Sequence, residues 1–172
     1  ELPCVVVPNG APVEAIANSV STVQTVVPPR YIVTVGLVIH RKGVDVLIDA
    51  LGLLAAEGET VPLVVVGDGA ERGALEKRAA ERGVAANVHF LGRQSHEHTV
   101  ALMKQSTFFV LASRAEGLPL VVAEAMACGK TVVATAVDGV PGIVTHDHNG
   151  LLVPAEDPKA LAEAIGRLWR ND

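Results

Sequence analysis

Several residue types are scarce in this sequence, and each scarcity excludes a class of protein or site. The 172 residues include two cysteines, Cys4 and Cys128, which are too few for a disulfide framework or a cysteine-ligated metal site. Aromatic residues account for only 3%, so valine, alanine and leucine must build the core. With 14 basic and 19 acidic residues, the chain lacks the basic stripe of a nucleic-acid binder, and we expect no nucleic-acid partner.

Long apolar runs are absent as well. None approaches the roughly 18–20 residues that span a membrane, and no signal peptide is visible. Because two cysteines fit a reducing compartment, we expect a cytoplasmic location. The chain opens on Glu1 and not on methionine, so we expect it to be part of a longer polypeptide.

Apolar residues, at 49%, are abundant, and short valine-rich runs of them alternate with longer segments of helical spacing. The runs are nearly continuous, which is typical of parallel strands covered on both faces. The predicted strands are 30–36, 62–68, 87–92, 106–112, 131–136 and 150–155. The predicted helical segments are 44–58, 71–83, 95–105, 119–129 and 157–170.

This alternation predicts an α/β fold with a Rossmann-like, doubly wound parallel sheet over residues 31–172. Residues 1–30 show little periodicity, and we interpret them as a lead-in or interdomain segment. Ligands of such sheets bind outside the carboxyl ends of the strands. The turns to weigh are therefore 36–43, 67–69, 92–93, 113–119 and 136–142.

Two glutamates stand out in one of these turns and the helix after it. Glu116 and Glu124 lie in an otherwise almost wholly apolar stretch, with Pro119 predicted at the first helical position. The amides of residues 120–122 would then be free to bind phosphate at the positive end of the helix dipole. A nucleotide diphosphate sugar would place its diphosphate there, its ribose near Glu124 and its sugar toward Glu116.

A simpler interpretation treats both acids as ordinary residues. Glu116 would then only favour the helix dipole, by about 0.3–1 kcal/mol, and Glu124 would be solvated. The apolar neighbours on both sides of Glu124 disfavour that interpretation.

The stretch SRAEGLPLVVAEAMACGKTVVATAVDGVP (113–141) resembles the E-x7-E signature segment of the family-4 retaining glycosyltransferases, which have the GT-B architecture. The similarity runs from PNG (8–10) through VGLVIHRKGVDVLIDAL, VVVGDG and VHFLG to NGLLV and the last helix. The resemblance implies that this chain is one half of a GT-B architecture. That half is the C-terminal, donor-binding one, and the N-terminal acceptor-binding domain would lie outside the chain.

The resemblance also implies roles for single residues. Glu116 would lie beside the donor sugar and the reacting carbon, and Lys42 would neutralise phosphate charge, which makes these two the implied catalytic residues. Arg93 would contact the base through its main chain. The implied substrate-binding residues are Gly36, Arg41, Lys42, Gly67, Gly92, Arg93, Glu116, Gly117, Leu118, Pro119, Leu120, Val121 and Glu124.

The implied reaction transfers a hexose from a UDP-, GDP- or ADP-linked sugar to a hydroxyl of a polysaccharide, glycolipid or glycoside, with retention. No metal or other cofactor is expected, because Lys42 and the helix terminus would stabilise the leaving diphosphate. We expect the isolated domain to be inactive. Membrane contact, at the inner face, is expected only through the absent half.

Two positions depart from the family pattern and keep alternatives open. Leu37 stands where an arginine usually shares the diphosphate with the lysine, and Gly142 stands where glutamate is common. These departures would fit a catalytically impaired nucleotide-binding domain, although Arg41 is close enough in sequence to substitute. A related nucleotide-sugar epimerase is a further alternative, against which the EGLP turn (116–119) counts.

The histidine pairs and Ser113 do not indicate a metal site or a hydrolase active site. His96 and His98, and likewise His146 and His148, are paired with an acid between them, but neither pair has an evident third ligand. Ser113 lacks the G-x-S-x-G pattern of a hydrolase nucleophile.

Overall fold

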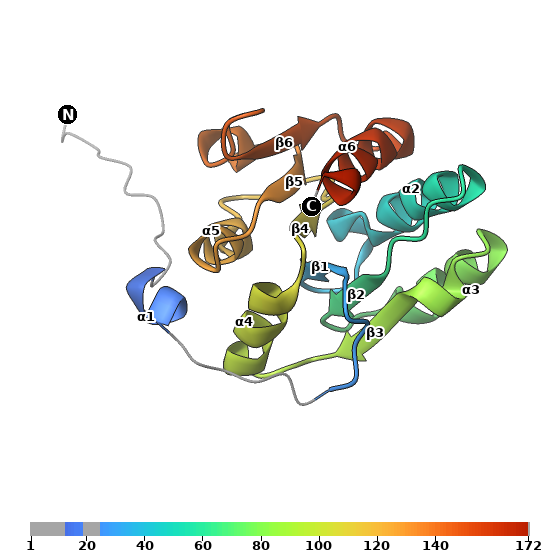
Figure 1. Ribbon diagram of the computed structural model, residues 1–172, viewed down its shortest axis with the longest axis horizontal. Coiled ribbons are helices and arrows are strands. Elements are labelled where there is room, and N and C mark those ends of the chain that lie inside the picture. Colours follow the sequence, from blue (N-terminus) through green and yellow to red (C-terminus); the bar gives the residue numbers. More distant parts are fainter. Residues whose placement is uncertain (1–12, 19–24, 172) are drawn as a thin grey trace, which may run out of the picture.

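A six-stranded, all-parallel sheet forms the centre of the protein, as the alternation of strands and helices predicts (Figure 1). This computed structural model describes residues 13–18 and 25–171. The strands lie in the order β3-β2-β1-β4-β5-β6. Their bounds are Ile32–Val35 (β1), Leu63–Val66 (β2), Val88–Gly92 (β3), Phe109–Leu111 (β4), Val132–Thr135 (β5) and Gly150–Val153 (β6).

Helices cover both faces of the sheet, and all five predicted helical segments are confirmed. The helices are Val13–Asn18 (α1), Val44–Ala56 (α2), Arg72–Glu81 (α3), His96–Gln105 (α4), Leu120–Ala127 (α5) and Pro158–Arg170 (α6). Short 3-10 turns occupy His40–Lys42, Ala85–Asn87 and Val140–Gly142. Helices α2, α3 and α6 lie on one face, and α4 and α5 lie on the other (Figure 1).

The core consists of two apolar layers, one on each face of the sheet. Successive strand residues point into opposite layers, as Ile32 and Val33 do, and both are fully buried. Every residue of β2 is buried in the same way. This two-sided burial explains why the strands read as continuous apolar runs and not as alternating ones.

Local signals fix the ends of several helices. The Asp157 carboxylate accepts hydrogen bonds from the amides of Lys159 and Ala160, and Pro158 opens α6. Such a cap stabilises a helix by about 1 kcal/mol. Gly58, with φ of 87°, follows the end of α2. Each of these ends was predictable because its cause lies within a few residues of the chain.

The predicted lead-in segment is described only in part. Residues 1–12 and 19–24, including Cys4 and the PNG turn, lie outside the described residues. Helix α1 lies in this segment and packs against α5, although the weak periodicity gave no reason to predict it. At the end of the segment, the Arg30 guanidinium stacks 3.9 Å from the ring of Trp169, near the end of α6. The domain boundary at residues 30 and 31 stays a prediction.

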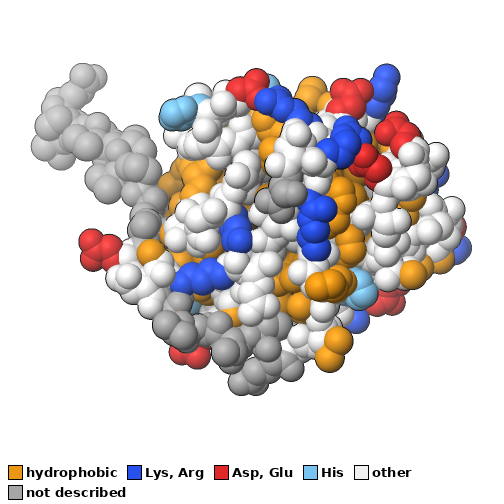
Figure 2. Space-filling view, viewed as in Figure 1, with side chains coloured by type: hydrophobic (Ala, Val, Ile, Leu, Met, Phe, Trp, Pro, Cys, Tyr) orange, Lys and Arg blue, Asp and Glu red, His pale blue; other side chains and the backbone are white. Residues whose placement is uncertain are grey.

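Charges of both signs are mixed on the face shown in Figure 2, where Lys and Arg side chains lie among acidic and uncharged ones. Among the helices of the described residues, none combines the length and apolarity needed to cross a membrane.

Tyr31 gives the fold a measurable pH dependence. Its hydroxyl is buried and donates a 2.8 Å hydrogen bond to the carbonyl of Leu102, and burial raises its pKa to about 12. In the unfolded chain a tyrosine ionises near pH 10. The neutral phenol therefore contributes stability that is complete below pH 10 and is lost as the pH rises to about 12, in total about 3 kcal/mol.

We expect the free energy of unfolding to fall more steeply between pH 10 and pH 12 in the wild type than in Tyr31→Phe. Urea unfolding of both proteins across this range measures the difference. Since Tyr31 is the chain's single tyrosine, its ionisation can also be followed directly by ultraviolet absorbance. A phenol that ionises near pH 10 in the folded protein would contradict the prediction.

Candidate functional site

The strand order creates a switch point between β1 and β4. From β1 the chain proceeds outward through β2 and β3, and from β4 it proceeds the other way through β5 and β6. The connections that leave β1 and β4 therefore run to opposite faces of the sheet and leave a crevice between them, which is where doubly wound sheets bind ligands. The two implied catalytic residues, Lys42 and Glu116, come from these two connections.

Lys42 and Glu116 contact each other directly. The Nζ atom of Lys42 lies 2.5 Å from Oε1 of Glu116, and the Ser113 hydroxyl donates a 2.6 Å hydrogen bond to the same oxygen. The Glu116 side chain is 6% exposed and that of Lys42 is 17% exposed. This oxygen therefore accepts from two donors where water has little access, which makes the ion pair stronger than a surface pair.

A close approach of two backbone segments makes this contact possible. Gly43, directly after Lys42, has φ of 64°, and a Cβ atom at this position would lie 1.9 Å from the carbonyl oxygen of Ala112. The turn before α2 thus rests on the end of β4 with no room for a side chain. Only glycine satisfies both the backbone angle and the space at this position.

Polar residues that the sequence did not single out hold the loop around Glu116. The amide of Glu116 donates to Oδ2 of Asp138 at 2.6 Å, and the Thr135 hydroxyl donates to the carbonyl of Ser113 at 2.6 Å. Asp138 adopts φ of 45°, which is uncommon for a residue with a side chain. Its place in the turn after β5, at the same sheet edge, was the signal that could have found it. Ser113 was considered only as a nucleophile, and its contact orients Glu116.

The start of α5 differs from the prediction by one position. Pro119 is the N-cap residue and α5 begins at Leu120, because the backbone angles of Pro119 (φ −76°, ψ 89°) are not helical. The amide of Val122, predicted to be free, donates a 2.9 Å bond to the carbonyl of Pro119. The amides of Leu120 and Val121 have no hydrogen-bond acceptor among the described residues. Two donors, and not three, therefore remain for a ligand.

Glycines at two strand ends, Gly36 and Gly67, line a neighbouring cavity, and a third, Gly92, lies beside them. Gly36 and Gly67 follow β1 and β2, and a Cβ atom on Gly67 would lie 1.9 Å from the carbonyl oxygen of Gly36. The amide of Gly67 donates to the carbonyl of Gly92 at 2.8 Å. A cavity of about 320 Å³ opens here, with Arg93 and Leu37 on its rim. At these two glycines no side chain covers the backbone, so a ligand could lie against the main chain there.

Gly36 joins this cavity to the ion pair. It lines the cavity, and a Cβ atom on it would lie 3.6 Å from Cε of Lys42. Leu37 is 50% exposed and gives an apolar surface between the cavity and the Lys42–Glu116 ion pair. The family pattern has an arginine at this position. The sequence-predicted residues Gly36, Lys42, Gly67, Gly92, Arg93 and Glu116 thus lie along one continuous edge.

The remaining predicted residues lie in the turn before α5, in α5 itself or in the turn that carries Lys42. Gly117 is exposed and Leu118 is half-buried in the turn after Glu116. Glu124 is half-buried in the second turn of α5, and its carboxylate has no hydrogen-bond or ion-pair partner among the described residues. Arg41 is exposed, and its carbonyl accepts a 2.8 Å hydrogen bond from the amide of Arg114.

Two of the four paired histidines make local contacts within the fold. Nδ1 of His98 lies 2.8 Å from Oε1 of Gln94, and Nδ1 of His146 accepts from the amide of Leu152 at 3.0 Å. Within the part of the chain that the structure describes, no group of three metal-ligating side chains is found. Cys128 is half-buried, and burial raises the pKa of its thiol.

The strand order and the glycine-rich carboxyl edge define a Rossmann-like α/β domain of the GT-B glycosyltransferase type. The chain belongs to the family described as glycosyl transferases group 1, whose model matches residues 21–172. This membership agrees with the resemblance of residues 113–141 to the E-x7-E signature segment.

Named relatives support this assignment. The chain is 35% identical to D-rhamnosyltransferase WbpZ of Pseudomonas aeruginosa, covering 83% of this chain and 37% of that protein. It is 37% identical to D-inositol 3-phosphate glycosyltransferase of Jonesia denitrificans, covering 78% of this chain and 33% of that one. The chain thus spans about a third of the length of these curated relatives.

Solved structures share the fold. Sucrose-phosphate synthase from Thermosynechococcus elongatus is 34% identical with a TM-score of 0.75, over 82% of this chain and 36% of that one. HepE of Anabaena, solved in complex with UDP and glucose, is 28% identical with a TM-score of 0.76, over 83% of this chain and 40% of HepE.

Proposed function

We propose that this chain is the donor-binding half of a retaining glycosyltransferase and that it binds a nucleotide diphosphate sugar at the β1/β4 switch point. The observation that carries the proposal is the convergence of three features at one edge. They are the Lys42–Glu116 ion pair, the two available amides of Leu120 and Val121, and the glycine-walled cavity. The family relationship and the UDP complex of the similar Anabaena HepE agree with this ligand class.

Each feature suits one part of the donor. The base fits the cavity beside Arg93, where the strand-end glycines let it reach the main chain. The diphosphate suits the start of α5, since the amides of Leu120 and Val121 and the helix dipole favour an anion there. Lys42 lies between the two and supplies a full positive charge.

Glu116 and Glu124 would then bind the two sugars of the donor. The carboxylate of Glu124 can accept from both vicinal hydroxyls of a ribose, and its lack of a protein partner leaves those lone pairs available. Glu116 is ordered by Ser113 and Lys42 and would face the transferred hexose.

In the proposed reaction the bond between the anomeric carbon and the diphosphate breaks, and an acceptor hydroxyl attacks from the same face. The leaving diphosphate takes up the proton of that hydroxyl and is stabilised by Lys42 and the α5 amides. No metal is needed in this scheme. The acceptor site would lie in another part of the full-length protein, so we expect this chain alone to bind nucleotide without turnover.

Leu37 favours a second candidate, a nucleotide-binding domain with impaired catalysis. The exposed leucine takes the place of a cation beside the proposed diphosphate site, which leaves Lys42 to neutralise the charge. Activity of the full-length protein on a nucleotide sugar, compared with binding of the same sugar, separates the two candidates. A nucleotide-sugar epimerase remains disfavoured by the pair of glutamates around the EGLP turn (116–119).

Calorimetric titration of the chain with UDP, GDP and ADP tests the proposal, and we expect one of them to bind. If UDP binds, Glu124→Ala is expected to weaken it by about 1.5–3 kcal/mol, because a charged hydrogen bond to the ribose is lost. The same substitution should weaken dUDP less, because dUDP already lacks the 2′-hydroxyl and keeps only the 3′-hydroxyl for Glu124.

Glu163→Ala is the matched control, since Glu163 is an exposed glutamate on α6, away from the proposed site. It should bind both nucleotides like the wild type. Equal losses for UDP and dUDP in Glu124→Ala would show that Glu124 does not bind the 2′-hydroxyl of the ribose. Failure of all three diphosphates to bind would overturn the proposed function.

A further inference from the structure

A second ion pair lies directly beside the Lys42–Glu116 pair. The guanidinium of Arg114 binds the Asp45 carboxylate through two hydrogen bonds, NH1 to Oδ1 at 2.8 Å and NH2 to Oδ2 at 2.7 Å. Their side chains are 14% and 19% exposed. Arg114 precedes Glu116 by two residues, and Asp45 follows Lys42 by three, so the second pair joins the same two segments as the first.

Arg114 also bonds to the turn that carries Lys42. Its NH1 group donates to the carbonyl of His40 at 2.6 Å, and its amide donates to the carbonyl of Arg41 at 2.8 Å. The Nε atom lies 3.1 Å from Oε1 of Glu156, in the turn before α6. One side chain therefore fixes the Lys42 turn and the Glu116 loop relative to each other and to α6.

Both members of this second pair are firmly charged. Burial alone would raise the pKa of Asp45, but the hydrogen bonds from Arg114 and from the amides of Asp45 and Val46 outweigh it and lower that pKa below its ordinary value. The hydrogen bonds to Asp45 and Glu156 raise the pKa of Arg114. A bidentate arginine pair also fixes direction as well as distance.

We propose that Arg114 is a positioning residue. Its two hydrogen bonds to Asp45 hold Lys42 and Glu116 in contact, and this contact sets the affinity for the donor nucleotide. The nucleotide part of this proposal rests on the proposed function. The alternative is that the Arg114–Asp45 pair only stabilises the fold, as many partly buried ion pairs do.

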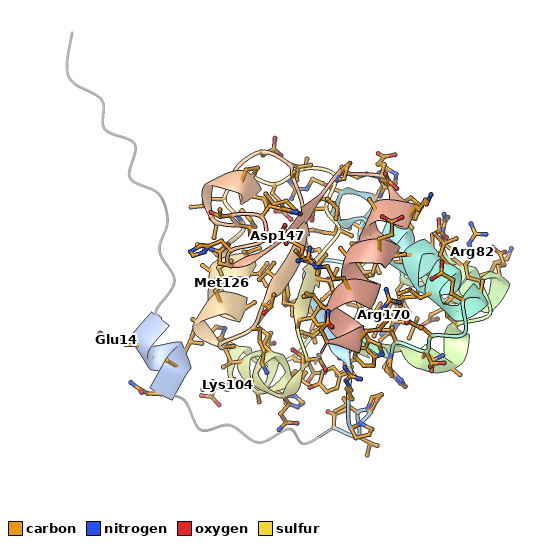
Figure 3. All side chains as sticks on the ribbon, turned by 45° about the horizontal axis from the view of Figure 1, so that its top comes forward. Glu14, Arg82, Lys104, Met126, Asp147 and Arg170 are labelled. Atoms are coloured by element: carbon orange, nitrogen blue, oxygen red, sulfur yellow. The ribbon has the colours of Figure 1, made fainter. Side chains whose placement is uncertain are left out.

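The chain offers a matched control on the same helix. Asp49 is also on α2, is 15% exposed at its side chain, and is bound by Arg78 and Arg82 of the α3 region. Figure 3 shows Arg82 at the side of the domain away from Met126 of α5, and the printed bonds of Asp49 run to Arg78 and Arg82 and not to the Lys42 turn or the Glu116 loop. Asp45→Asn and Asp49→Asn therefore remove the same charge from similar pairs, of which only one touches the Lys42 and Glu116 segments.

The first measurement needs no ligand. The coupling between Lys42→Met and Glu116→Gln is obtained from urea unfolding of the two single variants and the double variant. We expect this coupling to be lost in the Asp45→Asn background and to be unchanged in the Asp49→Asn background. Equal coupling in the two backgrounds would overturn the proposal, whatever the chain binds.

The second measurement is the Kd for the nucleotide diphosphate that the wild type binds. We expect Asp45→Asn to weaken it about tenfold, the effect of one misplaced charge-assisted hydrogen bond. Asp49→Asn should stay within about twofold, although both variants lose stability. Arg114→Lys keeps the charge but not the bidentate hydrogen bonds, so its Kd should lie between those of the other two variants. This variant also takes the place of Asp45→Asn if Asp45→Asn does not fold cooperatively. A wild type that binds no nucleotide would contradict the proposed function, and the coupling measurement would still decide the role of Arg114.

Discussion

Replacing Gly43 with alanine is expected to destabilise the protein by about 3 kcal/mol. An L-residue in the left-handed conformation costs roughly 1–2 kcal/mol, and the new methyl group would begin 1.9 Å from the carbonyl oxygen of Ala112. Relief of such overpacking by backbone shifts typically costs about 1–3 kcal/mol more. In a domain of this size the total corresponds to a fall in Tm of about 10 °C, which calorimetry or circular dichroism measures.

Gly73→Ala is the control for this substitution. Gly73 lies in α3, and a Cβ atom there would meet no atom within 4 Å. Alanine favours a helix over glycine by about 0.5–1 kcal/mol, so this variant should melt at or slightly above the wild-type temperature. If both variants melted alike, the contact between the Lys42 turn and the end of β4 would not be as close as described.

Replacing Lys42 with methionine is expected to cost about 3 kcal/mol of stability. The Glu116 carboxylate, 6% exposed, would lose its cation and keep the Ser113 hydroxyl as its side-chain donor. Breaking one partner of a buried ion pair typically costs about 3–5 kcal/mol, and the partial exposure of Lys42 places the expected value at the lower end. Urea unfolding of the variant and the wild type measures the loss.

The double variant Lys42→Met/Glu116→Gln tests the cause. Since it removes the unpaired charge, it should recover most of the lost stability. Lys77→Met serves as control, because Lys77 is 79% exposed in a loose pair with Glu81 and its loss should change stability by no more than about 0.5 kcal/mol. A double variant no more stable than Lys42→Met would show that the buried charge is not the source of the effect.

Local signals allowed much of the fold to be predicted. The strand runs and helix periodicity depend on neighbours within a few residues, and so does the Asp157 cap of α6. All six predicted strands and five helical segments are present in the structure. Where a local signal was weak the prediction failed, as for the short helix α1, or was displaced, as for Pro119, which lies one position before the helix it was expected to open.

The candidate site was predictable in its residues but not in their contacts. Turns at the carboxyl ends of parallel strands must share one edge, which is why Lys42, Glu116 and the strand-end glycines could be grouped in advance. The ion pair between Lys42 and Glu116 joins residues 74 positions apart, and the bond from Arg114 to Asp45 spans 69. Nothing in the sequence near Asp138 indicates that its carboxylate accepts the amide of Glu116.

The sequence by itself therefore determined the alternation of strands and helices and the sheet edge at which the candidate site residues meet, because spacing and residue type act over short stretches of chain. Only the tertiary structure decided which partner each charged group has. Those pairings depend on the strand order and on how closely the turns after β1 and β4 approach, which is a matter of backbone geometry at glycines such as Gly43 and not of any local pattern.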